Sequence, residues 1–159
     1  MTTPIVDFVR GYAEKNGVRL HMPGHKGKPH LGCEALDITE VAGADVLYDA
    51  TGVIAESEEN ATALFGSAHT FYSTEGATLA IKAMLAALVM SLPRGTRPRV
   101  LAARNAHKAF LYGAALLDIE VSWLYPTAPT HICACPVTAK DVAAALAACA
   151  EKPHAVYLT

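Results

Sequence analysis

Hydrophobic and polar positions follow two different periods along this chain. Residues 4–16 have the apolar spacing of an amphipathic helix, and Gly17 follows the last turn. A second helical pattern covers residues 54–65 and ends at Gly66. The residues between, 17–53, show weak periodicity and many Gly, Pro and Asp residues, which predicts a long irregular segment. Long ordered loops in compact domains are usually functional, so this segment is a candidate for function.

From residue 69 onward the pattern switches repeatedly between strands and helices. The predicted elements are a strand at 69–73, a helix at 76–90, a strand at 99–103, a helix over roughly 106–116, a strand at 120–124, a helix at 139–150 and a strand at 155–159. Thr138 and Asp141 have the spacing of a capping box for the helix at 139–150. Such alternation implies parallel strands with helices on both sheet faces, so the predicted fold class is α/β. The chain stops at Thr159, where an open α/β sheet would place a ligand-binding loop, and we expect the sheet to be truncated there.

Composition excludes several classes of protein. Hydrophobic residues make up 52% of the 159 positions, which excludes a disordered chain. Thirteen basic and fifteen acidic residues leave a net charge of −2, so nothing favours nucleic-acid binding. The N-terminus lacks the apolar core of a signal peptide, and the longest apolar run, AMLAALVMSL, is too short to span a bilayer. The four cysteines have no CxxC spacing, and we expect reduced thiols in a cytoplasmic protein.

Basic residues are concentrated between positions 94 and 108, where no acidic residue intervenes. They are Arg94, Arg97, Arg99, Arg104 and Lys108. The simpler interpretation is a solvated loop and strand edge, as for most short charge runs. The alternative is a basic wall that faces an anionic ligand.

The segment STEGATLAIKAM, residues 73–84, is the most informative for chemistry. A predicted strand ends at its start, Gly76 permits a tight turn, and a nearly all-apolar helix begins. The backbone N–H groups of Gly76, Ala77 and Thr78, together with the helix dipole and the Thr78 hydroxyl, would form an anion site that suits a phosphate monoester. The alternative is an ordinary strand–turn–helix junction that holds no ligand.

A second candidate, RNAHKA at 104–109, also follows the end of a predicted strand. Asn105 is the expected cap of the next helix, which places His107 in the first turn. A histidine there could stack on a planar ligand or carry protons; the alternative is packing against its own loop. Because both candidates follow the carboxyl ends of neighbouring strands, we expect them to open onto one crevice.

The histidine-rich stretch HMPGHKG, residues 21–27, allows a metal site as one interpretation. With the residues that follow, it offers His21, His25, His30 and Cys33. Their spacing matches none of the usual zinc patterns, and the Pro and Gly residues between them would leave the ligands on a flexible loop. Cys133 and Cys135 beside His131 favour a metal no more strongly. We therefore expect no metal site.

Taken in order, the motifs resemble one family, the ornithine/lysine/arginine decarboxylases, which are pyridoxal-phosphate enzymes of the aspartate-aminotransferase fold. The motifs are HMPGHKG, then Thr39-Glu40 with Gly43 and Asp45, then GVIAESEENATALFG, TEGAT and RNAHK. The order and spacing cover nearly the whole chain, and the start near HMPGHKG resembles the short bacterial form, without an extra N-terminal wing domain. The implied fold is the N-terminal part of a three-layer, mostly parallel sheet, with residues 1–53 as a helix and ordered loop and residues 54–159 as an incomplete cofactor-binding major domain.

The resemblance implies roles for the matched positions. Gly76, Ala77 and Thr78 fall where the family binds the phosphate of pyridoxal 5'-phosphate, and His107 falls where the family stacks an imidazole on the pyridine ring. HMPGHKG would be an ordered loop near the active-site entrance and the dimer contact. The full-length protein would be a homodimer or higher homo-oligomer that acts on a small amino acid, with no nucleic-acid or membrane partner.

Three positions depart from the family pattern. Glu75 stands where the family usually has Asn or a small residue, which adds a negative charge beside the phosphate pocket. Ala77 lacks a hydroxyl that is often present, although its N–H remains. Ala109 replaces the usual serine after His-Lys. Each departure would weaken cofactor binding without breaking the pattern.

The chemistry of such an enzyme also needs a lysine that forms a Schiff base with the cofactor and an acid that keeps the pyridine nitrogen protonated. The resemblance places both downstream of residue 159. None of the seven lysines has a matching context: Lys15, Lys26, Lys28, Lys82, Lys108, Lys140 and Lys152. We therefore expect an inactive N-terminal fragment of a decarboxylase of cationic amino acids. Two alternatives stay open, an aminotransferase or lyase of the same fold, and a short non-catalytic protein that binds an anion, a metal or a partner chain.

Overall fold

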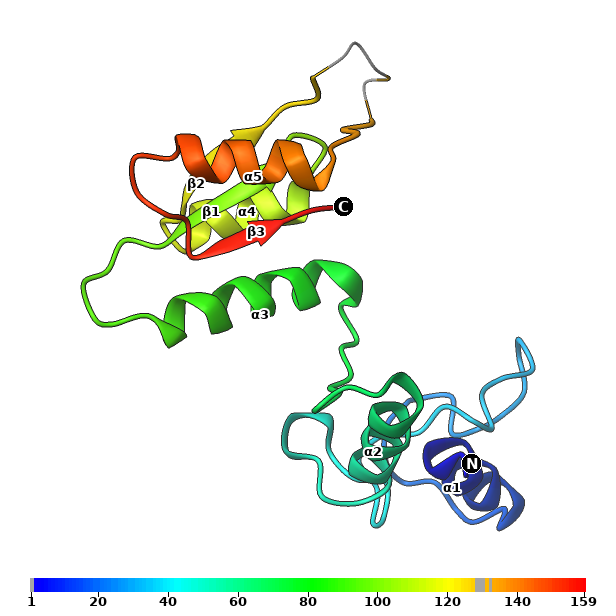
Figure 1. Ribbon diagram of the computed structural model, residues 1–159. Coiled ribbons are helices and arrows are strands. Elements are labelled where there is room, and N and C mark those ends of the chain that lie inside the picture. Colours follow the sequence, from blue (N-terminus) through cyan, green and yellow to red (C-terminus); the bar gives the residue numbers. More distant parts are fainter. Residues whose placement is uncertain (1, 128–130, 132) are drawn as a thin grey trace. The chain divides into compact units, whose positions relative to one another are not determined.

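The computed structural model describes residues 2–127, 131 and 133–159 (Figure 1). Its contacts divide the chain into two compact units, Met1–Tyr72 and Ser73–Thr159, called unit 1 and unit 2 below. The sequence suggested a boundary near residue 53 instead. The physical division lies later because the second helix packs against the first and so belongs with unit 1.

Unit 1 consists of two helices and a long irregular segment. Helix α1 spans Pro4–Glu14 and helix α2 spans Val53–Phe65, each within two residues of the predicted bounds. A single 3-10 turn, η1, covers Leu47–Asp49. As predicted, α2 ends at Gly66, whose left-handed φ of 64° allows its N–H to bond with the Thr62 carbonyl. The segment between α1 and α2 is irregular apart from η1, also as predicted.

Unit 2 is a small α/β unit whose elements alternate as predicted from residue 76 onward. They are α3 (Gly76–Ser91), β1 (Arg99–Ala103), α4 (Lys108–Leu116), β2 (Glu120–Leu124), α5 (Ala139–Ala148) and β3 (Ala155–Tyr157). The strands pair in parallel in the order β2-β1-β3. Thr138 and Asp141 form the predicted capping box at the start of α5. The α/β class and the parallel pairing are therefore confirmed.

The hydrophobic core of unit 2 lies between the sheet and helices α3 and α4. Val100 and Ala102 of β1 pack there with Leu85 of α3 and with Phe110 of α4, which is fully buried. The Phe110 ring stacks on Tyr157 of β3 at a centroid distance of 4.4 Å. Helix α5 covers the opposite face (Figure 1), where residues Leu101 and Ser122 line a surface groove with α5 side chains. Helices therefore cover both faces, as the alternation predicted.

The predicted strand at 69–73 is wrong, because this segment pairs with no strand in the described part of the chain. The backbone N–H of Tyr72 donates to the Glu58 carboxylate at 2.7 Å, and the Tyr72 hydroxyl donates to the Ser57 carbonyl at 3.0 Å. The Glu58 side chain of α2 thus binds the Tyr72 N–H, which a neighbouring strand would otherwise bind. Within the described residues, no helix is long and apolar enough to cross a bilayer.

Candidate functional site

The predicted phosphate-binding residues form the start of α3. Gly76, Ala77 and Thr78 are the first three residues of this helix, and all three are exposed. The preceding residue, Glu75, makes no side-chain capping bond to them, and its own N–H donates to the Ser73 hydroxyl at 3.3 Å. First-turn N–H groups have no acceptor inside a helix, so these three can bind an outside acceptor with the dipole of a 16-residue helix behind them.

Gly76 gives this turn its shape. Its φ of 63° lies in the left-handed region, where an L side chain is strained. A Cβ placed on Gly76 would meet no atom within 4 Å. Glycine is therefore needed for the backbone conformation, and the space beside the first turn of α3 is open to a ligand.

His107 caps helix α4, a role that the sequence assigned to Asn105. The His107 Nδ1 atom accepts a hydrogen bond from the Ala109 N–H at 3.2 Å, and the helix begins at Lys108. The helix starts later than predicted because Ala106 first closes a turn, its N–H donating to the Ala103 carbonyl at 3.0 Å. Asn105 instead accepts a hydrogen bond from the Thr159 hydroxyl at 3.2 Å. The His107 side chain is exposed, so its ring is available to a ligand.

Helices α3 and α4 bring the two candidate sites to the same end of unit 2. The helices pack closely at Gly113 of α4, where a Cβ would lie 2.8 Å from Leu85 and 3.5 Å from Lys82 of α3. Lys82 and Gly113 each lie between one and two turns from the start of their helix. Both helices run antiparallel to β1 (Figure 1), so both begin at the carboxyl end of the sheet. This is the edge at which open α/β sheets bind ligands.

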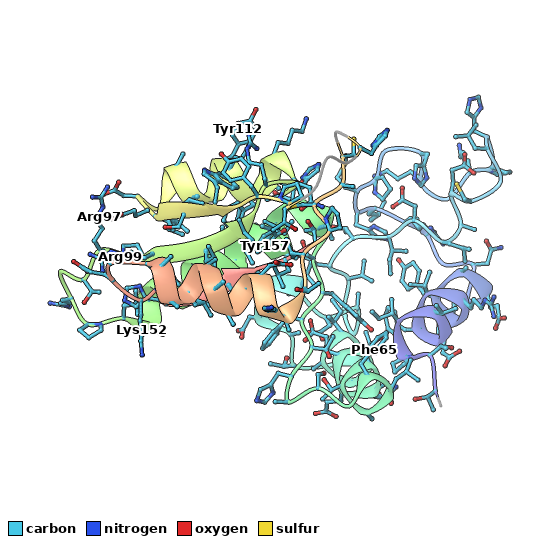
Figure 2. All side chains as sticks on the ribbon, turned by 45° about the horizontal axis from the view of Figure 1, so that its top comes forward. Phe65, Arg97, Arg99, Tyr112, Lys152 and Tyr157 are labelled. Carbon is cyan, nitrogen blue, oxygen red and sulfur yellow. The ribbon has the colours of Figure 1, made fainter. Side chains whose placement is uncertain are left out.

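The basic run between 94 and 108 does not form one wall, because β1 carries its members to opposite ends of the sheet. At the amino end, where Figure 2 labels Arg97 and Arg99, both guanidinium groups approach the Glu120 carboxylate, at 3.6 and 3.5 Å. Arg99 also pairs with Glu151. At the carboxyl end, the Arg104 guanidinium lies 5.1 Å from the centre of the Trp123 ring. Arg97 and Arg99 are therefore partly solvated and paired, which is the simpler of the two interpretations.

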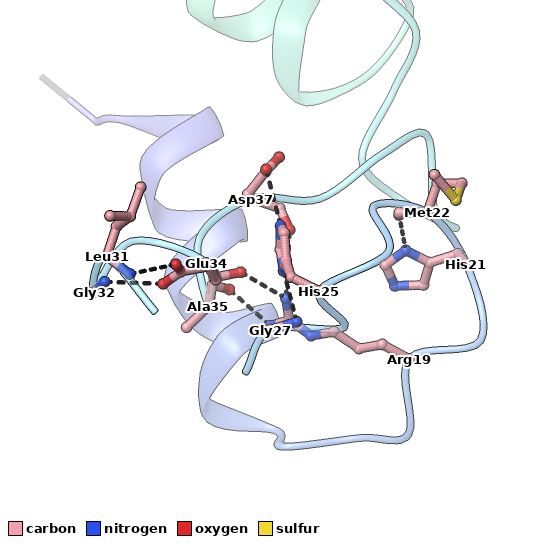
Figure 3. Close-up of polar contacts among 10 residues, drawn as sticks. All are labelled: Arg19, His21, Met22, His25, Gly27, Leu31, Gly32, Glu34, Ala35 and Asp37. Carbon is pink, nitrogen blue, oxygen red and sulfur yellow. Dashed lines mark hydrogen bonds and ion pairs between the residues drawn. The ribbon is translucent and has the colours of Figure 1, made fainter. Parts of the chain in front are cut away.

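The histidines of HMPGHKG make separate local contacts in unit 1. The His21 Nε2 atom lies 2.6 Å from the Tyr12 hydroxyl, and the His21 carbonyl accepts a bond from the Lys26 ammonium at 2.5 Å. The His25 Nε2 atom lies 3.1 Å from the Asp37 carboxylate (Figure 3). Within the described chain, no three His, Cys, Asp or Glu side chains are grouped as metal ligands. The stretch forms a turn held by polar contacts.

Arg19 and Glu34 hold this loop from inside (Figure 3). The Arg19 guanidinium donates to the backbone carbonyls of Glu34, Ala35 and Asp37, at distances between 2.7 and 3.4 Å. The Glu34 side chain is buried and accepts hydrogen bonds from the N–H groups of Leu31 at 2.5 Å and Gly32 at 2.9 Å. These bonds favour the carboxylate and lower the pKa of Glu34 to about 2.

Asp45 provides the cap of α2, which sequence analysis missed. Its carboxylate accepts bonds from the N–H groups of Thr51, Gly52 and Ile54 at 2.8–3.0 Å, and these bonds hold the pKa of Asp45 well below its usual range. The only sequence signal was its place in the spaced motif with Gly43. Since the capped amides lie six to nine residues away, local capping rules could not find them.

Large apolar side chains of the same irregular segment point to solvent. Glu34 is the one buried residue in the described stretch 17–53, and the strongly exposed apolar residues are Val18, Leu20, Met22, Leu31 and Tyr48, with relative exposures between 67% and 99%. Covering these side chains with another protein surface would remove apolar area from water. These five residues are called the exposed apolar loop residues below.

Comparison with known proteins adds independent information. The chain is 32% identical over 147 residues to a Bacillus subtilis (strain 168) protein named YaaO, covering 83% of this chain and 30% of that protein. It is also 32% identical over 134 residues to an arginine decarboxylase from Halalkalibacterium halodurans, covering 78% of this chain and 26% of that enzyme. The chain thus spans less than a third of the length of these relatives.

Solved structures show the same fold. Lysine decarboxylase A from Pseudomonas aeruginosa matches 91% of this chain with a TM-score of 0.66 and 26% identity, over 22% of its own length. The constitutive lysine decarboxylase of E. coli matches 97% of the chain with a TM-score of 0.67, and at 23% identity this likeness concerns the fold alone. The expected fold, that of pyridoxal-phosphate-dependent decarboxylases, is confirmed.

The family comparison covers nearly the whole chain, including both units and both candidate sites. The matching family model is described as "Orn/Lys/Arg decarboxylase, major domain" and extends over residues 3–156. This chain belongs to the Orn/Lys/Arg decarboxylase family.

Proposed function

We propose that the whole protein is a pyridoxal-phosphate-dependent decarboxylase of a cationic amino acid, and that unit 2 supplies one side of its cofactor site. The observation that carries the proposal is the position of two helix starts. The free N–H groups of Gly76, Ala77 and Thr78 and the imidazole of His107 lie at the carboxyl end of one parallel sheet. The family supports decarboxylation over the aminotransferase alternative, because the relatives are named as decarboxylases.

The start of α3 fits the phosphate of the cofactor. A phosphate accepts several N–H bonds at once, and a helix N-terminus beside a glycine turn offers them together with a favourable dipole. The Thr78 hydroxyl adds a donor, and the open space beside Gly76 leaves room for the phosphate. Glu75 opposes binding, because its carboxylate places a like charge next to this turn.

His107 fits the ring of the cofactor. Since Nδ1 accepts a bond from Ala109, the proton of the neutral imidazole resides on Nε2, and the cap holds the ring in one orientation. The exposed imidazole can then stack on a flat pyridine ring. When bound, pyridoxal 5'-phosphate would accept the electron pair that remains as the α-carboxylate leaves as CO₂.

Residues 1–159 alone are proposed to be inactive. The chemistry needs a lysine that bonds covalently to the cofactor, and the seven lysines of this chain have no matching context. Lys108 lies next to His107 at the carboxyl end of the sheet, as the first residue of α4. By the resemblance it matches the lysine that directly follows the stacking histidine in RNAHK, and not the lysine that forms the Schiff base.

The whole protein is proposed to act in the cytoplasm as a homodimer or larger homo-oligomer. The support is the exposed apolar loop residues, because burying side chains such as Leu20, 89% exposed, and Tyr48, 99% exposed, against another subunit would lower the free energy. Light scattering of the whole protein tests this. A strict monomer at all concentrations would contradict it.

The central experiment uses the protein at the length that its gene encodes, loaded with pyridoxal 5'-phosphate. Arginine, lysine and ornithine are supplied in turn, and CO₂ release and product identity are measured. We expect CO₂ and the matching amine from at least one substrate. Formation of a keto acid without CO₂ would show that the protein is an aminotransferase and not a decarboxylase. Failure to bind the cofactor would favour the non-catalytic alternative. Residues 1–159, assayed in parallel, should release no CO₂.

A further inference from the structure

The turn between β1 and α4 is tied to both neighbouring strands. On one side, the Arg104 N–H donates to the Leu124 carbonyl at the end of β2, at 3.0 Å. On the other side, the Asn105 Oδ1 atom accepts a bond from the hydroxyl of Thr159, just after β3, at 3.2 Å. The turn that presents His107 is therefore held between the carboxyl ends of two strands.

The two ties differ in kind. The Arg104 tie uses only backbone atoms and does not depend on the side chain. The Asn105 tie joins two side chains that are 54 residues apart in the chain. Neither Asn105 nor Thr159 belongs to the hydrophobic core of unit 2, so removing this bond would release one side of the turn without opening a cavity.

The position of the His107 ring depends on this turn. His107 is two residues beyond Asn105, and its side chain is committed to capping α4 through Nδ1. The ring therefore cannot reorient on its own when the turn shifts, and a displaced backbone carries the imidazole with it. A stacked ring tolerates little displacement, since misplacements of about 1 Å in an active site can cost about a hundredfold in rate.

We propose that Asn105 is a positioning residue of the cofactor site, which acts through the Thr159 hydroxyl to hold the His107 imidazole in its stacking position. The inference rests on the proposed function, in which His107 contacts the cofactor ring. It assigns a specific role to the Asn of RNAHK and to Thr159, the second residue after β3. It also explains why Asn105, the cap that the sequence predicts, makes no capping bond to α4: its side chain binds Thr159 instead.

The test compares Asn105→Ala, Thr159→Val and the double variant in the protein at its encoded length. Thr159→Ser, which keeps the hydroxyl, is the rescue variant. Asn60→Ala is the matched control, because Asn60 makes a similar long-range bond to the Thr2 side chain, at 3.1 Å, in unit 1. The readouts are kcat and KM, the visible circular dichroism of the bound cofactor, and the ¹⁵N signals of His107 in the cofactor-free protein.

We expect Asn105→Ala and Thr159→Val each to lower kcat by roughly tenfold with little change in KM, and to alter the cofactor's dichroism and the His107 signals. The double variant should be no worse than either single variant, since both remove the same bond. Thr159→Ser and Asn60→Ala should match the wild type. Additive losses in the double variant, or His107 signals that do not respond to Asn105→Ala, would overturn the proposal.

The two proposals can fail separately. If the wild type binds no cofactor, the proposed function fails, and the His107 signals of the cofactor-free protein still decide whether Asn105 and Thr159 position the ring. If the wild type is an active decarboxylase and the His107 signals do not change in Asn105→Ala or Thr159→Val, only the positioning role of Asn105 fails.

Discussion

The Nδ1 atom of His107 accepts a hydrogen bond from the backbone N–H of Ala109, 3.2 Å away, and this bond gives one histidine two tasks. It caps helix α4, and it orients the ring that is proposed to face the cofactor. Ala109 itself is buried against the core of unit 2, so the donor of this bond is anchored. The two tasks can be separated by substitution.

Replacing His107 by Asn or by Ala should separate capping from stacking. Asn is a good helix cap and Ala a poor one, so His107→Ala should destabilise α4 by about 1 kcal/mol relative to His107→Asn. Both variants lose the ring and should bind pyridoxal 5'-phosphate more weakly by a similar factor. Amide exchange in α4 and cofactor titration measure the two effects. Equal α4 stability in the two variants would show that His107 does not act as a cap.

Glu75 should weaken cofactor binding through its charge. Replacing it by Gln removes a negative charge from the residue before Gly76, so we expect the affinity for pyridoxal 5'-phosphate to rise severalfold, most strongly at low salt. Because an acidic residue also favours a helix N-terminus, α3 should lose a little stability, about 0.3–1 kcal/mol. Equilibrium titration at two salt concentrations checks the affinity. An unchanged or lower affinity would mean that the phosphate does not bind at this turn.

Gly113 should tolerate no larger residue, because α3 and α4 approach each other there. A Cβ would lie 2.8 Å from the Leu85 side chain, so Gly113→Ala should destabilise unit 2 by about 1–3 kcal/mol. Gly11→Ala is the matched control in α1, where a Cβ meets no atom within 4 Å, and it should stabilise its helix by about 0.5–1 kcal/mol. Amide exchange in α1, α3 and α4 measures both. Equal effects at the two positions would contradict the close packing.

Glu34 should make the loop around residues 31–34 sensitive to acid. Its pKa falls from an ordinary value of 4.5 to about 2, first because of the bond from the Leu31 N–H and further because of that from Gly32. A depressed carboxyl pKa adds stability that is fully present above pH 4.5 and is lost as the pH falls toward 2. Glu34→Gln should therefore remove the pH dependence of Leu31 and Gly32 amide protection across this window.

The control for that experiment is Glu14→Gln, at an exposed position at the end of α1. It should keep the wild-type dependence of the Leu31 and Gly32 amides on pH. A wild-type loop whose protection is constant between pH 4.5 and 2 would contradict the role assigned to the Glu34 carboxylate.

Much of unit 2 was predictable because its signals are local. The α3 sequence is apolar over four turns, β1 and β2 match their predicted bounds, and Thr138 with Asp141 caps α5 as expected. The features that were predicted wrongly are those whose hydrogen-bond partners lie far away in the sequence. Residues 69–73 have strand-like composition, but Tyr72 bonds to α2, and the expected cap Asn105 bonds to Thr159.

The order of helices and parallel strands, the glycine turn at Gly76 and the family follow from the amino-acid sequence alone, because periodicity and short motifs are read over a few neighbouring residues. Three features emerge only once the chain is folded: His107 caps α4, Asp45 caps α2 from outside the helix, and the chain divides after Tyr72. The physical reason is that a backbone N–H bonds to whichever acceptor the fold brings within reach. That acceptor can be far away in sequence, and in such cases local propensity carries no information about it.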